Sequence, residues 1–201
     1  MAAAGAGADA IGLIFYNKSP RSVSVEQARE ILQSLPPMIS PVGLFVNAEA
    51  RQIRETANRL NIRTIQLHGT ETIEILEQLA DFTVIKAVKF DLAALKMWTD
   101  AAARWVNLRG LLLETARTDE PGGSGVENDW AGIQSTMKGL RLLPPLIAAG
   151  GLTPENVGAV VRLLRPYAVD VSTGIEESRG IKSADKMKRF AEEVRGADND
   201  V

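Results

Sequence analysis

Short apolar segments alternate along this chain with longer amphipathic segments. The apolar segments are continuous rather than alternating in polarity, and each is followed by a turn that contains Gly, Ser, Pro or Asn. Continuous apolar strands are typical of a parallel sheet that is covered on both faces. The pattern predicts seven strands, at 10–15, 42–46, 64–67, 83–88, 110–113, 146–149 and 168–172.

The amphipathic segments have the spacing of helices, and some carry start signals. Ser24 precedes Glu26 and Gln27, and Thr153 is a cap residue followed by Pro154 at the first helical position. Strict alternation of strand and helix predicts an α/β fold with parallel strands. The helices are expected at 24–35, 49–60, 71–80, 92–103, 128–138, 153–165 and 183–195.

Two architectures share this alternation, a closed (β/α)₈ TIM barrel and an open doubly wound sheet. Polar and glycine residues gather just after the carboxyl ends of the predicted strands, which converge on one face in a barrel, so the barrel is favoured. A barrel needs eight strands, and 2–8 is typical of the last turns of a helix that leads into the strand at 10–15. We therefore expect residues 1–201 to form a single, N-terminally incomplete barrel domain that lacks the first strand and most of the first helix.

Composition narrows the possible functions. With 45% hydrophobic residues, 24% charged residues and a net charge of −2, the chain fits one globular domain and offers no basic surface for nucleic acid or anionic lipid. No apolar run approaches the ~20 residues that span a bilayer, and the start lacks a secretory signal, so a cytoplasmic protein is expected. The absence of cysteine excludes a disulfide framework, thiolate ligands and a cysteine nucleophile or base, and the single histidine, His68, excludes a zinc site of several imidazoles.

Five segments, in order and in register with the predicted strands, resemble phosphoribosylanthranilate isomerase over nearly the whole chain. Each motif alone is weak, because glycine also serves ordinary turns. The segments are Gly7-Ala8-Asp9 through Lys18-Ser19-Pro20-Arg21, Val42-Gly43-Leu44-Phe45-Val46-Asn47, Gln66-Leu67-His68-Gly69, Gly122-Gly123-Ser124-Gly125 with Asp129-Trp130, and Ala149 through Val157 followed by Asp170 through Glu176.

The resemblance implies the Amadori rearrangement of N-(5-phosphoribosyl)anthranilate to 1-(2-carboxyphenylamino)-1-deoxyribulose 5-phosphate in tryptophan biosynthesis. This chemistry needs a general acid at the ring oxygen and a general base at C2, and no cofactor or metal. The family's acid is an aspartate at the end of its sixth strand, where this chain has Glu114, with one more methylene. The family's base is a cysteine in the first strand, and this chain has neither.

The candidate site residues follow the predicted strands. Glu114 is the candidate acid, although a structural carboxylate could cap a helix or pair with a cation. The resemblance implies that Arg21 holds the anthranilate carboxylate; His68 is expected to line the substrate, and Asp170 to orient a substrate hydroxyl or to satisfy backbone donors. A phosphate is expected at backbone N–H groups of the last two loops, at Gly150, Gly151, Thr173 and Gly174.

One further segment is expected to act at the site. Gly122-Gly123-Ser124-Gly125 follows the candidate acid and predicts a mobile loop that closes over the substrate. The three tryptophans, in contrast, are expected to pack helices on the barrel.

Two alternatives stay open. The chain could be a degenerate barrel that binds a sugar phosphate without catalysis, or another sugar-phosphate barrel enzyme, in which Lys86 would be the best placed Schiff-base lysine. The missing strand favours an internal methionine as the recorded start, so the 201-residue chain alone is expected to fold poorly and to catalyse little. The expected partner is a small sugar phosphate, with no nucleic acid and no membrane, and the expected state is a monomer or homodimer.

Overall fold

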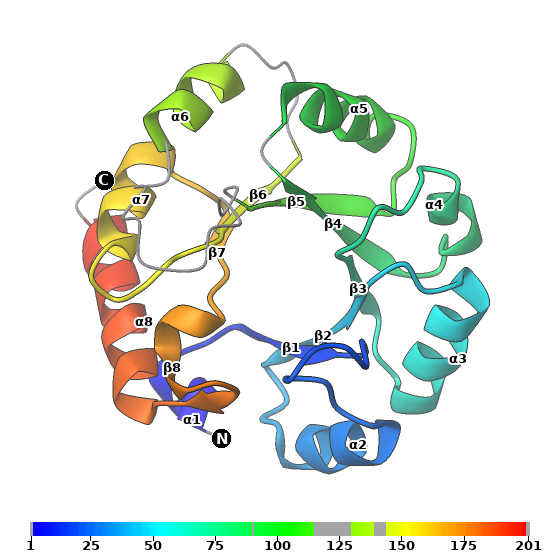
Figure 1. Ribbon diagram of the computed structural model, residues 1–201, viewed down its shortest axis with the longest axis horizontal. Helices are drawn as coiled ribbons and strands as arrows, with labels where there is room; N and C mark the ends of the chain where they lie inside the picture. Colours follow the sequence, from blue (N-terminus) through cyan, green and yellow to red (C-terminus); the bar gives the residue numbers. More distant parts are fainter. Residues whose placement is uncertain (1, 90, 115–129, 139–143, 200–201) are drawn as a thin grey trace.

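The chain folds into a parallel sheet that curls around a common centre, with helices on its outside (Figure 1). The computed structural model describes residues 2–89, 91–114, 130–138 and 144–199. Within these ranges every strand of the large sheet pairs in parallel with its neighbour in sequence, and β1 and β7 are its two edges. Its strands are β1 (Ala10–Ile14), β2 (Ser40–Phe45), β3 (Thr64–Leu67), β4 (Thr83–Lys89), β5 (Leu108–Glu114), β6 (Leu146–Ala149) and β7 (Ala168–Val169).

The helices form an outer layer around the sheet (Figure 1). At α2 the predicted start is confirmed: Ser24 accepts a hydrogen bond from the Gln27 backbone, and the Gln27 side chain accepts one from the Ser24 backbone. The helices are α1 (Ala2–Ala6), α2 (Val25–Ser34), α3 (Ala50–Leu60), α4 (Ile75–Gln78), α5 (Leu92–Ala102), α6 (Trp130–Lys138), α7 (Val157–Leu164) and α8 (Ala184–Asn199).

Successive residues of each strand point to opposite faces of the sheet, and two apolar clusters result. Leu111 and Leu113 of β5 belong to the larger cluster, in which the sheet packs against the helices. Leu112, between them, packs with Ala87 and Ala149 in a small separate cluster inside the curl. The next inward position on β5 is Glu114, so this carboxylate points into the end of the curled sheet where the strands have their carboxyl ends. We call this end the mouth.

The seven predicted strands and the helix before β1 are confirmed, although β7 is shorter than the predicted 168–172, and two predicted helix starts are wrong. The helix expected from 71 begins at Ile75, as α4. We expected a helix from 153, whereas α7 begins at Val157. The Thr153 N–H donates to the Asn156 side chain, whose amide in turn donates to the Gly151 carbonyl, so the segment closes into a turn first. The antiparallel pair β8 (Glu176–Ser178) and β9 (Ile181–Lys182) after the short η1 (Thr173–Ile175) was not predicted.

Candidate active site

Two predicted site residues meet at the mouth of the curled sheet. Glu114 ends β5, and His68 follows β3 directly. The His68 Nε2 lies 3.2 Å from Glu114 Oε1, and the side chains are 26% and 34% exposed. Both groups are therefore held by buried strands while water and a small ligand can still reach them.

The hydrogen bonds of His68 determine its tautomer. The Gln66 Nε2 donates to His68 Nδ1 at 2.9 Å, which leaves the ring proton on Nε2, facing Glu114. The hydrogen bond with Glu114 is the main cause that raises the pKa of His68. The same bond lowers the pKa of Glu114 against the opposing effect of burial. When Nδ1 also takes a proton, the Gln66 amide has to turn its oxygen toward the ring.

Asp170 completes a group of three titratable side chains at the mouth. It follows β7, and its backbone N–H donates to the Ala148 carbonyl at 2.8 Å. Water reaches its side chain, yet the surrounding protein atoms raise the pKa of the carboxyl by desolvation. The nearby His68 imidazole acts in the opposite direction, and the Glu114 carboxylate adds to the rise. Asp170 thus interacts electrostatically with both members of the pair.

On the other side of the mouth, the Arg21 guanidinium is paired with the Glu176 carboxylate. Its Nε and Nη2 donate to the two oxygens of Glu176, at 2.5 and 2.6 Å. Lys182 donates to the same carboxylate at 3.1 Å. These donors, Arg21 first, lower the pKa of Glu176 to about 2. Glu176 was not predicted as a partner of Arg21, because the two residues are 155 positions apart in the sequence.

The two predicted phosphate loops lie against each other. Gly150 and Gly151 have positive φ angles of 88° and 67°. A Cβ at Gly174 would come 2.9 Å from the carbonyl carbon of Leu152 and still closer to its oxygen, so only glycine lets the two loops meet here. Thr173 begins η1 beside this contact. The backbone therefore brings the four predicted residues to one edge of the mouth.

Lys86 does not point into the mouth. Its ammonium donates to the Leu67 and Gly69 carbonyls and to Glu71 Oε2, and it lies 5.5 Å from the centre of the Trp98 ring on α5. The Lys86 and Glu71 side chains are each 3% exposed. An imine-forming lysine has to meet a carbonyl substrate, and this enclosed ammonium faces the helices instead. The sequence offered no signal that Glu71, one of 25 acidic residues, would be its partner.

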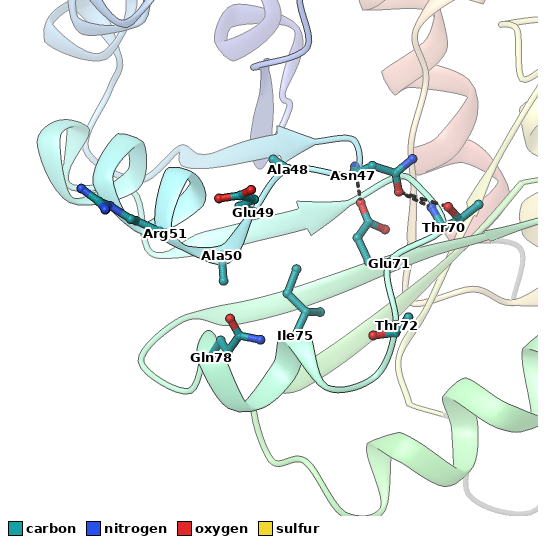
Figure 2. A pocket seen from close by; sticks show the side chains of 10 residues that line it. All are labelled: Asn47, Ala48, Glu49, Ala50, Arg51, Thr70, Glu71, Thr72, Ile75 and Gln78. Atoms are coloured by element: carbon teal, nitrogen blue, oxygen red, sulfur yellow. Dashed lines mark hydrogen bonds between the residues drawn. The ribbon is translucent and has the colours of Figure 1, made fainter.

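A hollow lies between α3 and α4, beside the mouth (Figure 2). Asn47, Glu71, Thr70 and Arg51 are among its lining residues. There the Glu71 side chain points toward the Asn47 backbone nitrogen, the Asn47 side chain points toward Thr70, and Arg51 points away from them (Figure 2). The hollow shares Glu71 with the Lys86 pair but contains neither His68 nor Glu114, so we place the chemistry at the mouth.

Over the described ranges, no group of three or more His, Cys, Asp or Glu side chains is placed to hold a metal ion. No helix in those ranges is long and apolar enough to cross a bilayer. The predicted glycine loop at 122–125 lies outside the described residues.

The chain is similar to known proteins over almost its whole length. Residues 1–193 match the family model of N-(5'-phosphoribosyl)anthranilate (PRA) isomerase. The isomerase of Pseudomonas fluorescens (strain SBW25) is 45% identical over 98% of this chain and 90% of its own length. The solved isomerase of Thermotoga maritima is 38% identical, with a TM-score of 0.81, over 97% of this chain and 92% of its own. A solved isomerase bound to reduced 1-(o-carboxyphenylamino)-1-deoxyribulose 5-phosphate is 36% identical, with a TM-score of 0.78, over 97% and 91%.

Proposed function

The chain belongs to the N-(5'-phosphoribosyl)anthranilate isomerase family, and we propose that it converts N-(5-phosphoribosyl)anthranilate to 1-(2-carboxyphenylamino)-1-deoxyribulose 5-phosphate in tryptophan biosynthesis. The observation that carries the proposal is the pair of His68 and Glu114, 3.2 Å apart at the mouth of the curled sheet. A carboxyl group at the end of a barrel strand stands where catalytic groups of this fold are placed.

The proton for the sugar ring oxygen comes from this pair. The pKa of Glu114 is lowered and the pKa of His68 is raised by their mutual hydrogen bond, so a proton added to the pair rests on the imidazole. Glu114 delivers the proton as the bond between C1 and the ring oxygen breaks, and His68 replaces it. Activity that depends on this proton should fall as the pH rises through the raised pKa of His68.

The other predicted residues take supporting roles in this proposal. Arg21 uses N–H groups that face away from Glu176 to bind the anthranilate carboxylate, because its guanidinium has five donors. Backbone N–H groups near Gly150, Gly151, Thr173 and Gly174 bind the phosphate, supported by the contact of the two loops at Leu152. Asp170 orients a ribose hydroxyl.

The proposed assembly is a monomer or a homodimer. A dimeric isomerase of Thermotoga maritima, 33% identical with a TM-score of 0.73, has been obtained as monomers.

A second candidate function is binding of the same sugar phosphate without turnover. One observation favours it: the chain holds no cysteine, the residue type that the resemblance implies as the base at C2. The two candidates differ in one measurable property, because both bind the reduced product analogue but only the first consumes substrate.

Turnover by the purified 201-residue chain tests the proposal, and near-normal turnover would refute the expectation from the sequence that this chain alone catalyses little. Conversion of N-(5-phosphoribosyl)anthranilate is followed by chromatography and mass spectrometry in the parent chain and in Glu114→Gln. We expect the variant to lose about 10²–10⁴-fold in kcat, because an amide cannot donate the proton of a carboxyl group. Glu55→Gln, which removes an exposed carboxylate on α3, is the matched control.

Three outcomes are informative. Turnover that survives in Glu114→Gln within about tenfold would remove Glu114 from the acid role. A parent chain that binds the product analogue without turnover would support the second candidate, and a chain that neither binds nor converts would contradict both.

A further inference from the structure

The backbone on both sides of His68 accepts hydrogen bonds from a buried ammonium group. Lys86, on the adjacent strand β4, donates to the carbonyl of Leu67 at 3.3 Å and to that of Gly69 at 2.6 Å. These carbonyls belong to the residues immediately before and after His68. One side chain therefore ties down the chain on both sides of the ring that meets Glu114.

Glu71 holds this ammonium and the same stretch of backbone. Its Oε2 accepts from Lys86 Nζ at 2.7 Å, and its two oxygens accept from the Gly69 N–H at 3.0 Å. Its Oε1 also accepts from the Asn47 N–H, at 2.9 Å, which ties β3 to the loop after β2. With 3% of each side chain exposed, the ion pair is shielded from water and its geometry is fixed.

Asn47 closes the network from the neighbouring loop (Figure 2). Its Oδ1 accepts from the Thr70 N–H at 2.7 Å, and its backbone has a positive φ of 52°. A Cβ at Gly69 would come 2.8 Å from the Asn47 nitrogen and closer still to its side-chain oxygen. The chain after His68 thus passes against Asn47 at a distance that only glycine permits.

We propose that Lys86, Glu71 and Asn47 are positioning residues for the acid of the isomerase reaction: they fix the backbone on both sides of His68 so that its Nε2 meets Glu114. The inference rests on the proposed function, in which this pair supplies the proton. None of the three needs to contact the substrate, and Lys86 is enclosed between β4 and Trp98.

The charge of Lys86 and its proposed positioning role have opposite effects on the pKa of His68. The groups that act on the pKa of His68 are Glu114 from β5, Asp170 after β7 and Lys86 from β4. Lys86 by its charge lowers the pKa of His68, whereas the contact with Glu114 raises it. A loss of positioning and a loss of charge therefore move the His68 pKa in opposite directions, which makes the two roles separable.

The test uses the fact that His68 is the only histidine in the chain. Nitrogen-15 NMR of the imidazole in the full 201-residue chain reports its tautomer and its pKa without assignment of other residues. The main variant is the double substitution Lys86→Met with Glu71→Gln, which leaves no unpaired buried charge. The matched control is Arg51→Gln with Glu55→Gln, an ion pair on α3 with side chains 86% and 61% exposed.

In the parent chain we expect the neutral ring to carry its proton on Nε2 and to titrate above the ordinary histidine value. In the double variant we expect a mixture of tautomers and a lower His68 pKa, because the contact with Glu114 loosens while the two removed charges compensate each other. kcat should fall on the order of 10²-fold for a displacement near 1 Å, with KM changed less than about threefold. The control should match the parent in every measurement.

Several results would overturn the inference. One is a folded double variant with the parent's tautomer and titration, and another is a His68 pKa that rises, as loss of the Lys86 charge alone requires. If the double variant does not fold, Asn47→Gly decides: it keeps the positive φ, removes the acceptor of Thr70 and should shift the His68 signals in the same direction. Unchanged signals there would refute positioning. A parent chain without turnover contradicts the proposed function, and the NMR result still decides the positioning role.

Discussion

Two carboxylates organise opposite sides of the mouth, and they do so in different ways. On the β3 side, Glu71 accepts mainly from backbone N–H groups and from one buried lysine. On the β7 side, Glu176 is held mainly by the side chains of Arg21 and Lys182, which are 21% and 33% exposed. Both carboxylates are largely covered, at 3% and 8% exposure, but the cation paired with Glu71 is buried whereas the two cations paired with Glu176 reach water.

The β3 side of the mouth therefore has a fixed geometry, whereas the β7 side can adapt to a ligand. Hydrogen bonds to the backbone at Gly69 and Asn47 hold the chain itself, so the β3 side has one geometry. Pairing between side chains at Glu176 holds Arg21 in a position from which it can also turn toward a ligand. We therefore expect the acid to depend on the first side and recognition of the substrate carboxylate on the second.

The largest effect is expected for Lys86→Met. This change leaves the Glu71 carboxylate buried without its cation, and loss of one partner of a buried ion pair costs about 3–5 kcal/mol. The free energy of unfolding from urea denaturation should fall by that amount. The double variant with Glu71→Gln should recover a large part of the lost stability. If the unfolding free energy of Lys86→Met lies within about 1 kcal/mol of the parent value, the ion pair is not shielded from water.

A smaller effect is expected for Gly174→Ala, at the contact of the last two loops. The new methyl group would overlap the Leu152 carbonyl, and backbone rather than a flexible side chain has to move. Such overpacking costs about 1–3 kcal/mol. Affinity for the reduced product analogue, measured by calorimetry, should fall together with stability because the proposed phosphate site is built from these loops. If the variant were destabilised but kept full affinity, the phosphate would have to bind elsewhere.

The order of elements was predictable from the sequence because each strand carries its own signal. Continuous apolar runs and turn residues predicted all seven strands of the large sheet, and the end of β5 at Glu114 followed from them. The partners of the site residues were not predictable in this way. Glu176 is 155 positions from Arg21, and Lys86 is 15 from Glu71, so only the folded chain brings them together.

Local competition explains the error at the start of α7. Thr153 and Pro154 are good start signals, but the side chain of Asn156 hydrogen-bonds to the loop that contains Gly151. A turn that serves two loops therefore takes the place of the first helical turn.

The smallest effect, and the one that depends on pH, is expected for Glu176→Gln. Arg21 and Lys182 lower the pKa of Glu176 from 4.5 to about 2, so the folded protein favours its charged form. This stabilisation is complete above pH 4.5 and is lost as the pH falls toward 2, where the folded protein also takes up the proton. Because water screens the exposed cations, the substitution should cost only about 1–2 kcal/mol near pH 7. The difference in unfolding free energy between parent and variant, measured by urea denaturation from pH 7 to pH 3, should shrink with falling pH. A difference that is independent of pH would mean that Glu176 contributes by shape and not by charge, and the contrast with Glu71 would then lie in burial alone.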